Sequence, residues 1–388
     1  MLIISHRLTL TFILVSFTCF CSAQSVIIQS GILLPKDTTI NNQVITSLNG
    51  FLKQKEKPNN ANNFVLKERL LETEILLDAM KGSALNSKLK DSNYYKCYLT
   101  NLTRLDNDNF IVQISYMGID EHTPVLHASY RLLAKRVGTQ FCFYSPLKQN
   151  TIGWKTRKFN NITYHFRDTI NIVNAKAYQK KISFYDDKLK APQQFVEVYL
   201  CDNFLEVQQL TGIEYMQDYA GYKTINLDTR ENNITLVVNG WNSETRRFDP
   251  HDLWHARLRI VLSPGVINRP VDEACAYLYG GSWGFAWNEI VAQFKKYVAD
   301  NPNADWLKLY IEGNNFAGTE KILKISYMLN ALIVQKMEKE KGFPAVMELL
   351  GCGKKETGDE NYFKALDKLT GINKTNFNLK MQELIKGS

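Results

Sequence analysis

The stretch Asp249-Pro-His-Asp-Leu-Trp-His255 is the part of this chain that says most about its fold and its site. Aspartate is a preferred N-cap residue and proline is favoured at the first helical position, so a helix is expected to begin at Pro250. His251 and His255 then lie four residues apart on one helix face, where two imidazoles can bind one metal ion. Trp254 lies between them and is expected to pack beneath that ion.

A second segment, Val271-Asp-Glu-Ala-Cys-Ala-Tyr-Leu-Tyr-Gly-Gly281, follows shortly after. Its small residues at positions 274–276 would let two helices approach closely, and Gly280-Gly281 would end the helix. Glu273 adds a carboxylate to the two imidazoles, which is the three-ligand set of a catalytic zinc site with an open fourth position. The sequence therefore predicts His251, His255 and Glu273 as metal ligands and Zn²⁺ as the ion. The alternative is that both histidines line a polar cleft without a metal.

The region before residue 150 changes from a helical to a strand-like pattern. Apolar residues recur at helical spacing first, and runs rich in Tyr, Phe, Val and Ile follow, broken by Asn, Asp and Gly. This order predicts an α+β domain over residues 24–150, with helices packed on an antiparallel sheet. The expected helices are residues 42–57 and 64–80, and the expected strands are 94–102, 110–116, 126–133 and 140–144.

Residues 151–388 show a different order and are expected to form a second domain. After a linker or entry strand over residues 153–161, strands and helices alternate, and from Gly281 onward only helical patterns follow. The expected strands are residues 162–166, 195–200 and 234–238, and the expected helices before the two-histidine helix are 172–189 and 203–210. The later helices are expected at residues 287–299, 319–337, 344–350, 362–369 and 377–385.

Residues 162–385 resemble the gluzincin metallopeptidases. In that family an α/β half ends in a His-Glu-x-x-His helix, a second helix supplies the third ligand, and a helical half covers the site; Glu273-Ala-Cys-Ala-Tyr277 is similar to the segment with the third ligand. The resemblance implies a zinc-dependent enzyme that hydrolyses peptide bonds, with a peptide or protein as substrate. The alternative is a catalytically inactive peptidase-fold protein that binds peptides or an envelope partner.

Position 252 departs from that family pattern. The family places there the glutamate that acts as general base, whereas this chain has Asp252, which the resemblance makes the candidate catalytic residue. Aspartate is shorter by one methylene, about 1.5 Å. A misplacement of this size costs on the order of a hundredfold in rate unless the site compensates. Tyr277 and Tyr327 are the candidates for stabilising a developing oxyanion.

The composition excludes some classes of function. The net charge is +8, from 47 Lys and Arg against 39 Asp and Glu. The basic residues are scattered rather than clustered, so no nucleic-acid partner is expected. Five cysteines follow residue 23 without Cys-x-x-Cys spacing; either they are buried thiols, or bridges form after export, with Cys97 and Cys142 the first candidate pair.

Residues 1–23 are predicted to be a cleavable signal peptide. His6 and Arg7 provide a charged start, an apolar run covers residues 8–20, and small residues precede Gln24. The run is too short to span a bilayer, and no later segment is long and apolar enough, so no transmembrane segment is expected in the mature chain. Cleavage is expected after Ala23, which predicts a secreted or periplasmic protein.

Overall fold

The computed structural model describes residues 25–223, 225–241, 248–318 and 320–387. The predicted signal peptide lies outside these residues. The chain has a mixed α+β fold and divides into two compact units. The first comprises Met1–Asn150 and Gln208–Ala220, and the second comprises Thr151–Val207 and Gly221–Ser388. Among the described residues, no helix is both long enough and apolar enough to cross a membrane.

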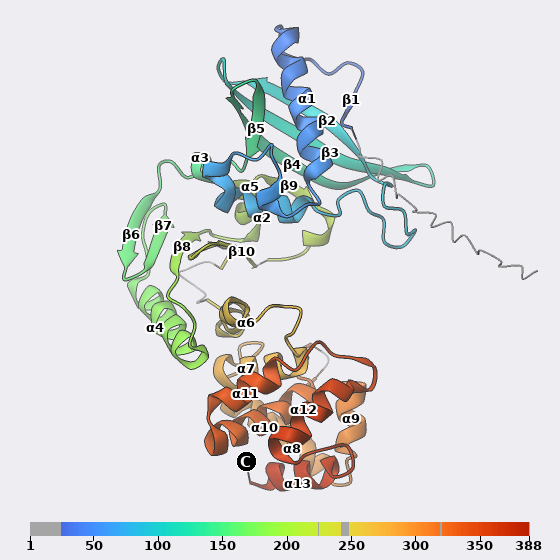
Figure 1. The fold of residues 1–388 in the computed structure, drawn as a ribbon, viewed down its shortest axis with the longest axis vertical. Coiled ribbons are helices and arrows are strands. Elements are labelled where there is room, and N and C mark those ends of the chain that lie inside the picture. The colour runs from blue at the N-terminus through green and yellow to red at the C-terminus, as the bar shows by residue number, and fades with distance from the viewer. Residues whose placement is uncertain (1–24, 224, 242–247, 319, 388) are drawn as a thin grey trace, which may run out of the picture. The chain divides into compact units, whose positions relative to one another are not determined.

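The first unit consists of helices packed on a largely antiparallel sheet. The sheet has the strand order β1-β2-β3-β4-β5, and β9 pairs with β4. Figure 1 shows α1 lying across this sheet, and its residues Val44, Leu48 and Phe51 are buried. The strands are β1 (Ile27–Ile28), β2 (Lys96–Arg104), β3 (Asn109–Asp120), β4 (Thr123–Val137), β5 (Gln140–Tyr144) and β9 (Ile213–Met216). The helices are α1 (Thr38–Gln54), α2 (Leu70–Met80) and α3 (Leu147–Asn150), with short 3-10 turns at Asn59–Ala61, Lys67–Arg69 and Gln217–Tyr219.

The sheet order excludes the first candidate pair of cysteines. Cys97 lies on β2 and Cys142 on β5, and β3 and β4 separate these strands. Neighbouring strands are about 4.8 Å apart, which puts the two residues on the order of 14 Å from each other. A disulfide needs Cα atoms within about 7 Å, so this pair cannot form a bridge. All five cysteines of the described chain are free thiols, and Cys97 and Cys142 are buried.

The second unit begins with a mixed sheet of strand order β10-β11-β8-β7-β6. The central pairs β11–β8 and β8–β7 are parallel, and the two edge pairs are antiparallel. The strands are β6 (Lys155–Phe159), β7 (Ile162–Phe166), β8 (Phe195–Leu200), β10 (Asn226–Glu231) and β11 (Ile234–Asn239). The region expected to be a linker or entry strand thus contains the edge strand β6. The edge strand β10 was not predicted, because its sequence Asn-Leu-Asp-Thr-Arg-Glu is polar.

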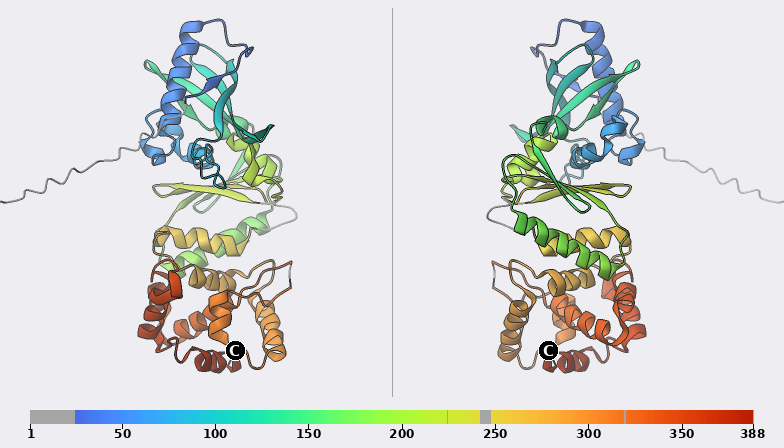
Figure 2. Two further views of the ribbon diagram at one scale, coloured as in Figure 1. Left: turned by 90° about the vertical axis from the view of Figure 1, so that its right-hand side faces the viewer. Right: turned by 90° about the vertical axis from the view of Figure 1, so that its left-hand side faces the viewer.

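Helices complete the second unit. Figure 2 shows α4 (Ile172–Leu189) and α6 (Pro250–Val261) on the same side of the sheet, with the remaining helices beyond them. These are α7 (Arg269–Gly280), α8 (Trp287–Asp300), α9 (Trp306–Glu312), α10 (Ile325–Lys341), α11 (Phe343–Leu350), α12 (Glu360–Thr370) and α13 (Phe377–Lys386), with a 3-10 turn at Thr357–Asp359. The change from a sheet-containing part to a helical part therefore falls at α6 and α7.

The segment between β8 and β10 divides between the two units. Helix α5 (Phe204–Thr211) begins in the second unit and ends in the first, and Ile213–Met216 then forms β9 against β4. The sequence pattern alone predicts that this whole segment belongs to the second domain. Only the pairing of β9 with β4 assigns it to the first unit.

Helices α4 and α6 are joined by a buried ion pair. Arg257 is 3% exposed, and its Nε and Nη2 donate to the two oxygens of Asp186 at 2.7 and 2.8 Å. A two-point contact between guanidinium and carboxylate fixes both distance and orientation. This pair therefore fixes the position of α6, the helix with the two histidines, against α4.

Candidate metal centre

Helix α6 begins where the sequence predicted. Asp249 is the N-cap residue and its Oδ1 accepts a hydrogen bond from the His251 backbone N–H at 2.8 Å. Pro250 occupies the first turn, where its missing N–H costs nothing. The imidazoles of His251 and His255 project from the same face, with ring centroids 4.8 Å apart.

Helix α7 packs against α6 and against α10. Its small residues Ala274, Cys275 and Ala276 are fully buried. The two helices α6 and α7 approach closely at Gly280, where an added Cβ would lie 2.8 Å from the backbone of Pro250 and His251. Gly280 therefore permits the contact that brings α7 to the start of α6.

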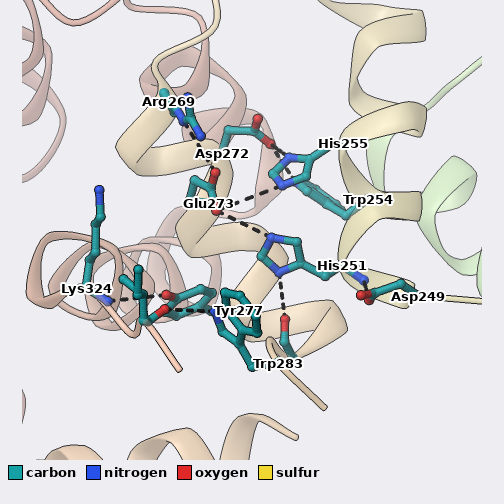
Figure 3. A network of polar contacts seen from close by, with 12 residues as sticks. Asp249, His251, Trp254, His255, Arg269, Asp272, Glu273, Tyr277, Trp283 and Lys324 are labelled. Atoms are coloured by element: carbon teal, nitrogen blue, oxygen red, sulfur yellow. Dashed lines mark hydrogen bonds and ion pairs between the residues drawn. The ribbon is translucent and has the colours of Figure 1, made fainter. Parts of the chain in front are cut away.

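Three side chains from these two helices converge (Figure 3). The Nε2 of His251 lies 3.4 Å from Oε2 of Glu273, and the Nε2 of His255 lies 4.0 Å from the same oxygen. The ligand atoms of His251, His255 and Glu273 all lie within 4.8 Å of one another, so this cluster can hold a metal ion. Each side chain is 14% exposed, which leaves the cluster partly open to solvent.

Both histidines use their second ring nitrogen for another contact. His251 Nδ1 lies 2.8 Å from the carbonyl oxygen of Gly281, and His255 Nδ1 lies 2.9 Å from Oδ1 of Asp272. A carbonyl and a carboxylate accept hydrogen bonds, so each Nδ1 is the protonated nitrogen and each Nε2 is free to bind a metal. Trp254 is fully buried, and its Nε1 donates to the same Asp272 oxygen at 3.0 Å. Its ring is thus fixed beside His255.

Within the cluster, the positive form of His251 and the negative form of Glu273 stabilise each other. Burial opposes a charge on His251, but its contacts with Glu273 and the Gly281 carbonyl outweigh burial and raise the pKa of His251. Burial likewise opposes ionisation of Glu273, but the His251 contact and the charges of both histidines lower the pKa of Glu273. A proton on His251 Nε2 therefore occupies a position that a metal ion would take, and the two compete.

Arg269 and Tyr327 border the cluster on the side of Glu273. Arg269 Nε lies 3.4 Å from Glu273 Oε1, so the carboxylate oxygen that does not face the histidines has a partner. Burial, followed by the Glu273 charge, raises the pKa of Tyr327, and the Tyr327 side chain hydrogen-bonds to Arg269. Tyr327 therefore contacts Arg269, which in turn pairs with Glu273.

Tyr277, the other tyrosine that the sequence suggested, is placed differently. It is only 2% exposed, and its hydroxyl accepts from the Lys324 backbone N–H at 3.3 Å. Its ring centroid is 6.0 Å from that of His251, and it packs edge-on against Tyr327. The contacts of Tyr277 are those of a packing residue that supports His251.

Asp252 lies at the junction of two cavities. One, of about 620 Å³, is also lined by His251, His255 and Glu273, and the other, of about 490 Å³, lies between α6 and the sheet. Asp252 is exposed and has no hydrogen-bond or ion-pair partner among the described residues. Partial desolvation, followed by repulsion from Asp249, raises the pKa of Asp252.

Three contributors to the cluster could not be assigned from sequence. Asp272 was visible beside Glu273, but which carboxylate faces the ligand position depends on the rotation of α7. The Gly281 carbonyl and Arg269 carry no motif signal at all. Among known sequences, no family model matches the chain, and no curated protein matches it either.

Proposed function

We propose that the second unit is a gluzincin-like zinc metallopeptidase domain in which His251, His255 and Glu273 hold Zn²⁺. One observation carries this proposal. Both imidazoles have their Nδ1 engaged, by Gly281 and Asp272, and turn their Nε2 toward the same carboxylate oxygen. In protein zinc sites, one ring nitrogen of a histidine binds the ion while the other donates a hydrogen bond to a carbonyl or carboxylate, and a further carboxylate can complete the ligand set.

One of the distances in the cluster already suits zinc, and the others are longer. Zinc–ligand bonds of about 2.0–2.2 Å in a tetrahedron place neighbouring ligand atoms roughly 3.3 Å apart. The His251–Glu273 separation of 3.4 Å already matches this value, and the His255–Glu273 separation of 4.0 Å exceeds it by less than an ångström. The ligand atoms of the two histidines lie within 4.8 Å of each other, so the three side chains would draw closer together around a bound ion.

The position of the cluster within the second unit supports the same proposal. The sheet-containing part ends at α6, and the helical part begins with α7, so the ligands lie where the two parts meet. This is the arrangement that the gluzincin resemblance implies. The cavity of about 620 Å³ beside the ligands offers room for a peptide substrate.

A bound zinc ion would polarise the scissile carbonyl and acidify a water molecule. The protein's own contribution is proton transfer by Asp252, whose carboxylate accepts a proton from the attacking water and delivers it to the leaving amine. Its raised pKa brings it closer to the value that suits a group which must both take and release a proton. Arg269 fixes Glu273 from the opposite side.

A second candidate function rests on the identity of residue 252. Asp252 carries its carboxylate about 1.5 Å closer to its own backbone than a glutamate would. A shortfall of this size can leave the protein inactive, and the fold would then serve to bind peptides or an envelope partner. Zinc binding is expected under both candidate functions, whereas peptide hydrolysis is expected only under the first.

The first experiment measures metal content by mass spectrometry on residues 24–388. One zinc per wild-type chain is expected, with loss of that zinc in the His251→Ala/His255→Ala variant. A wild-type protein without zinc would refute the proposed site. Peptide hydrolysis that disappears in His255→Ala identifies a working peptidase, and a zinc-loaded protein that cleaves no peptide identifies the binding protein.

Export of the protein is a further part of this proposal. Residues 1–23 have the order of charged, apolar and small residues that signal peptidase recognises, and the mature protein would be secreted or periplasmic. N-terminal sequencing of the mature protein is expected to start at Gln24. A chain that retains Met1 would show that residues 1–23 are not removed.

A further inference from the structure

The helix that supplies both histidines also carries a cation into the same cavity. His251, His255 and Arg259 are spaced four residues apart along α6 and therefore lie on one face. All three line the cavity of about 620 Å³. Arg259 is exposed and makes no ion pair with any residue that the structure describes, although its charge also acts on Asp228 of the neighbouring cavity. Its guanidinium can therefore turn to a ligand.

A second free cation reaches the cavity from the segment after α11. Lys354 lines the cavity, is exposed, and has no ion-pair partner in the described part of the chain. Its backbone is fixed from two sides. The Asn268 side chain, at the start of α7, donates to the Gly353 carbonyl at 3.1 Å, and the Asn361 side chain donates to the Lys354 carbonyl at 2.7 Å. The backbone that carries Lys354 is thus fixed to the start of the helix that provides Glu273.

The other cations around the cavity are already paired, and the carboxylate without a partner among its described lining residues is Asp252, the residue proposed to transfer protons. Lys355 lies 3.5 Å from the Asp359 carboxylate, and Arg269 lies 3.4 Å from Glu273. Asp272 accepts from His255 and from Trp254. A divalent ion on the cluster would add further positive charge. Arg259 and Lys354 are therefore the cations left to meet an incoming group.

Two apolar residues also line the cavity. Pro264 and Ile267, from the turn between α6 and α7, line it together with Arg259 and Lys354. A ligand that suits this lining carries a negative group beside a short apolar portion. A peptide with a carboxylate near the bond to be cleaved has this chemistry.

We infer that this cavity selects peptides that carry a carboxylate next to the metal-bound residue, held by Arg259 and Lys354. This inference rests on the proposed function. A guanidinium and an ammonium both form charge-assisted hydrogen bonds to a carboxylate. The carboxylate is either the free C-terminus of the peptide or an Asp or Glu side chain, and the two sources are distinguished by experiment.

The test measures affinity rather than turnover, so it does not depend on catalysis. Zinc-loaded protein is titrated calorimetrically with acetyl-Leu-Leu as the free acid, its C-terminal amide, acetyl-Leu-Asp-amide and acetyl-Leu-Asn-amide. The same titrations use Arg259→Gln/Lys354→Gln and a control variant, Lys296→Gln, which alters an exposed lysine of α8 outside the cavity. Zinc content is measured on every sample.

The wild-type protein is expected to bind one carboxylate form about tenfold more tightly than its neutral counterpart. Preference for the free acid identifies the C-terminus as the source, and preference for Asp over Asn identifies a side chain. The preference is expected to disappear in the double variant and to persist in Lys296→Gln. Equal affinities for all four peptides with zinc bound would overturn this inference alone, and absence of zinc from the wild type would overturn the proposed function as well.

Discussion

Replacement of Asp272 tests how the metal ligands are held. Its Oδ1 accepts from His255 Nδ1 at 2.9 Å and from the buried Trp254 Nε1 at 3.0 Å. In Asp272→Asn the amide oxygen can take both hydrogen bonds, so this variant removes the negative charge and little else. In Asp272→Ala both partners are lost, and the Trp254 N–H is left unpaired in a fully buried position.

Asp272→Ala is therefore expected to lower zinc affinity and stability more than Asp272→Asn does. Groups that orient a metal-binding histidine contribute roughly 10- to 100-fold in metal affinity, which is about 1.4–2.7 kcal/mol. We expect Asp272→Asn to lower zinc affinity by about tenfold with little change in stability, since the loss is one of charge. Asp272→Ala is expected to lower zinc affinity by close to a hundredfold, and the unpaired indole costs about 1–3 kcal/mol in the free energy of unfolding.

Competition with a chromophoric zinc chelator measures the affinities, and urea unfolding of the metal-free proteins measures stability. Asp300→Asn is the control, because Asp300 is an exposed residue at the end of α8. Zinc affinity of Asp272→Ala within twofold of the wild type would refute the reasoning, since it would mean that His255 is not oriented through Asp272.

Three further predictions concern the helices that carry the site. Gly280→Ala is expected to lower zinc affinity at least tenfold and to cost about 1–3 kcal/mol of stability, because its Cβ would meet the backbone of His251 at 2.8 Å. Chelator competition measures the affinity and urea unfolding measures the stability. Unchanged stability would contradict the close approach of the two helices. If the short carboxylate limits catalysis, Asp252→Glu is expected to raise the rate of peptide cleavage by on the order of a hundredfold without changing zinc content. A zinc-loaded Asp252→Glu variant that is no faster than the wild type would show that another feature limits the rate. Arg257→Ala is expected to destabilise the protein by about 3 kcal/mol, because it leaves the largely buried Asp186 carboxylate without its partner. A chemical denaturation midpoint equal to that of the wild type would argue against this ion pair as a structural link between α4 and α6.

Local signals in the sequence located most elements of the second unit. The Asp-Pro pair at residues 249–250 marked the start of α6, since capping and proline geometry depend only on neighbouring residues. The helical pattern after Gly281 corresponds to α8 and α10–α13, although α10 begins at Ile325 rather than near residue 319 and the short α9 was missed. The polar edge strand β10 was also missed, because an edge strand needs no apolar alternation to pair on one side.

By itself, the sequence determined that two imidazoles would share one helix face, because the spacing of four residues dictates this in any α-helix. Tertiary structure decided the rest of the cluster. The packing of α7 on α6 at Gly280 decided that Glu273 faces the histidines while Asp272 supports one of them from behind. It also brought the carbonyl of Gly281, thirty residues along the chain, to His251. Such contacts join segments distant in sequence, and a carbonyl oxygen is present in every residue, so no local pattern can specify which one will serve.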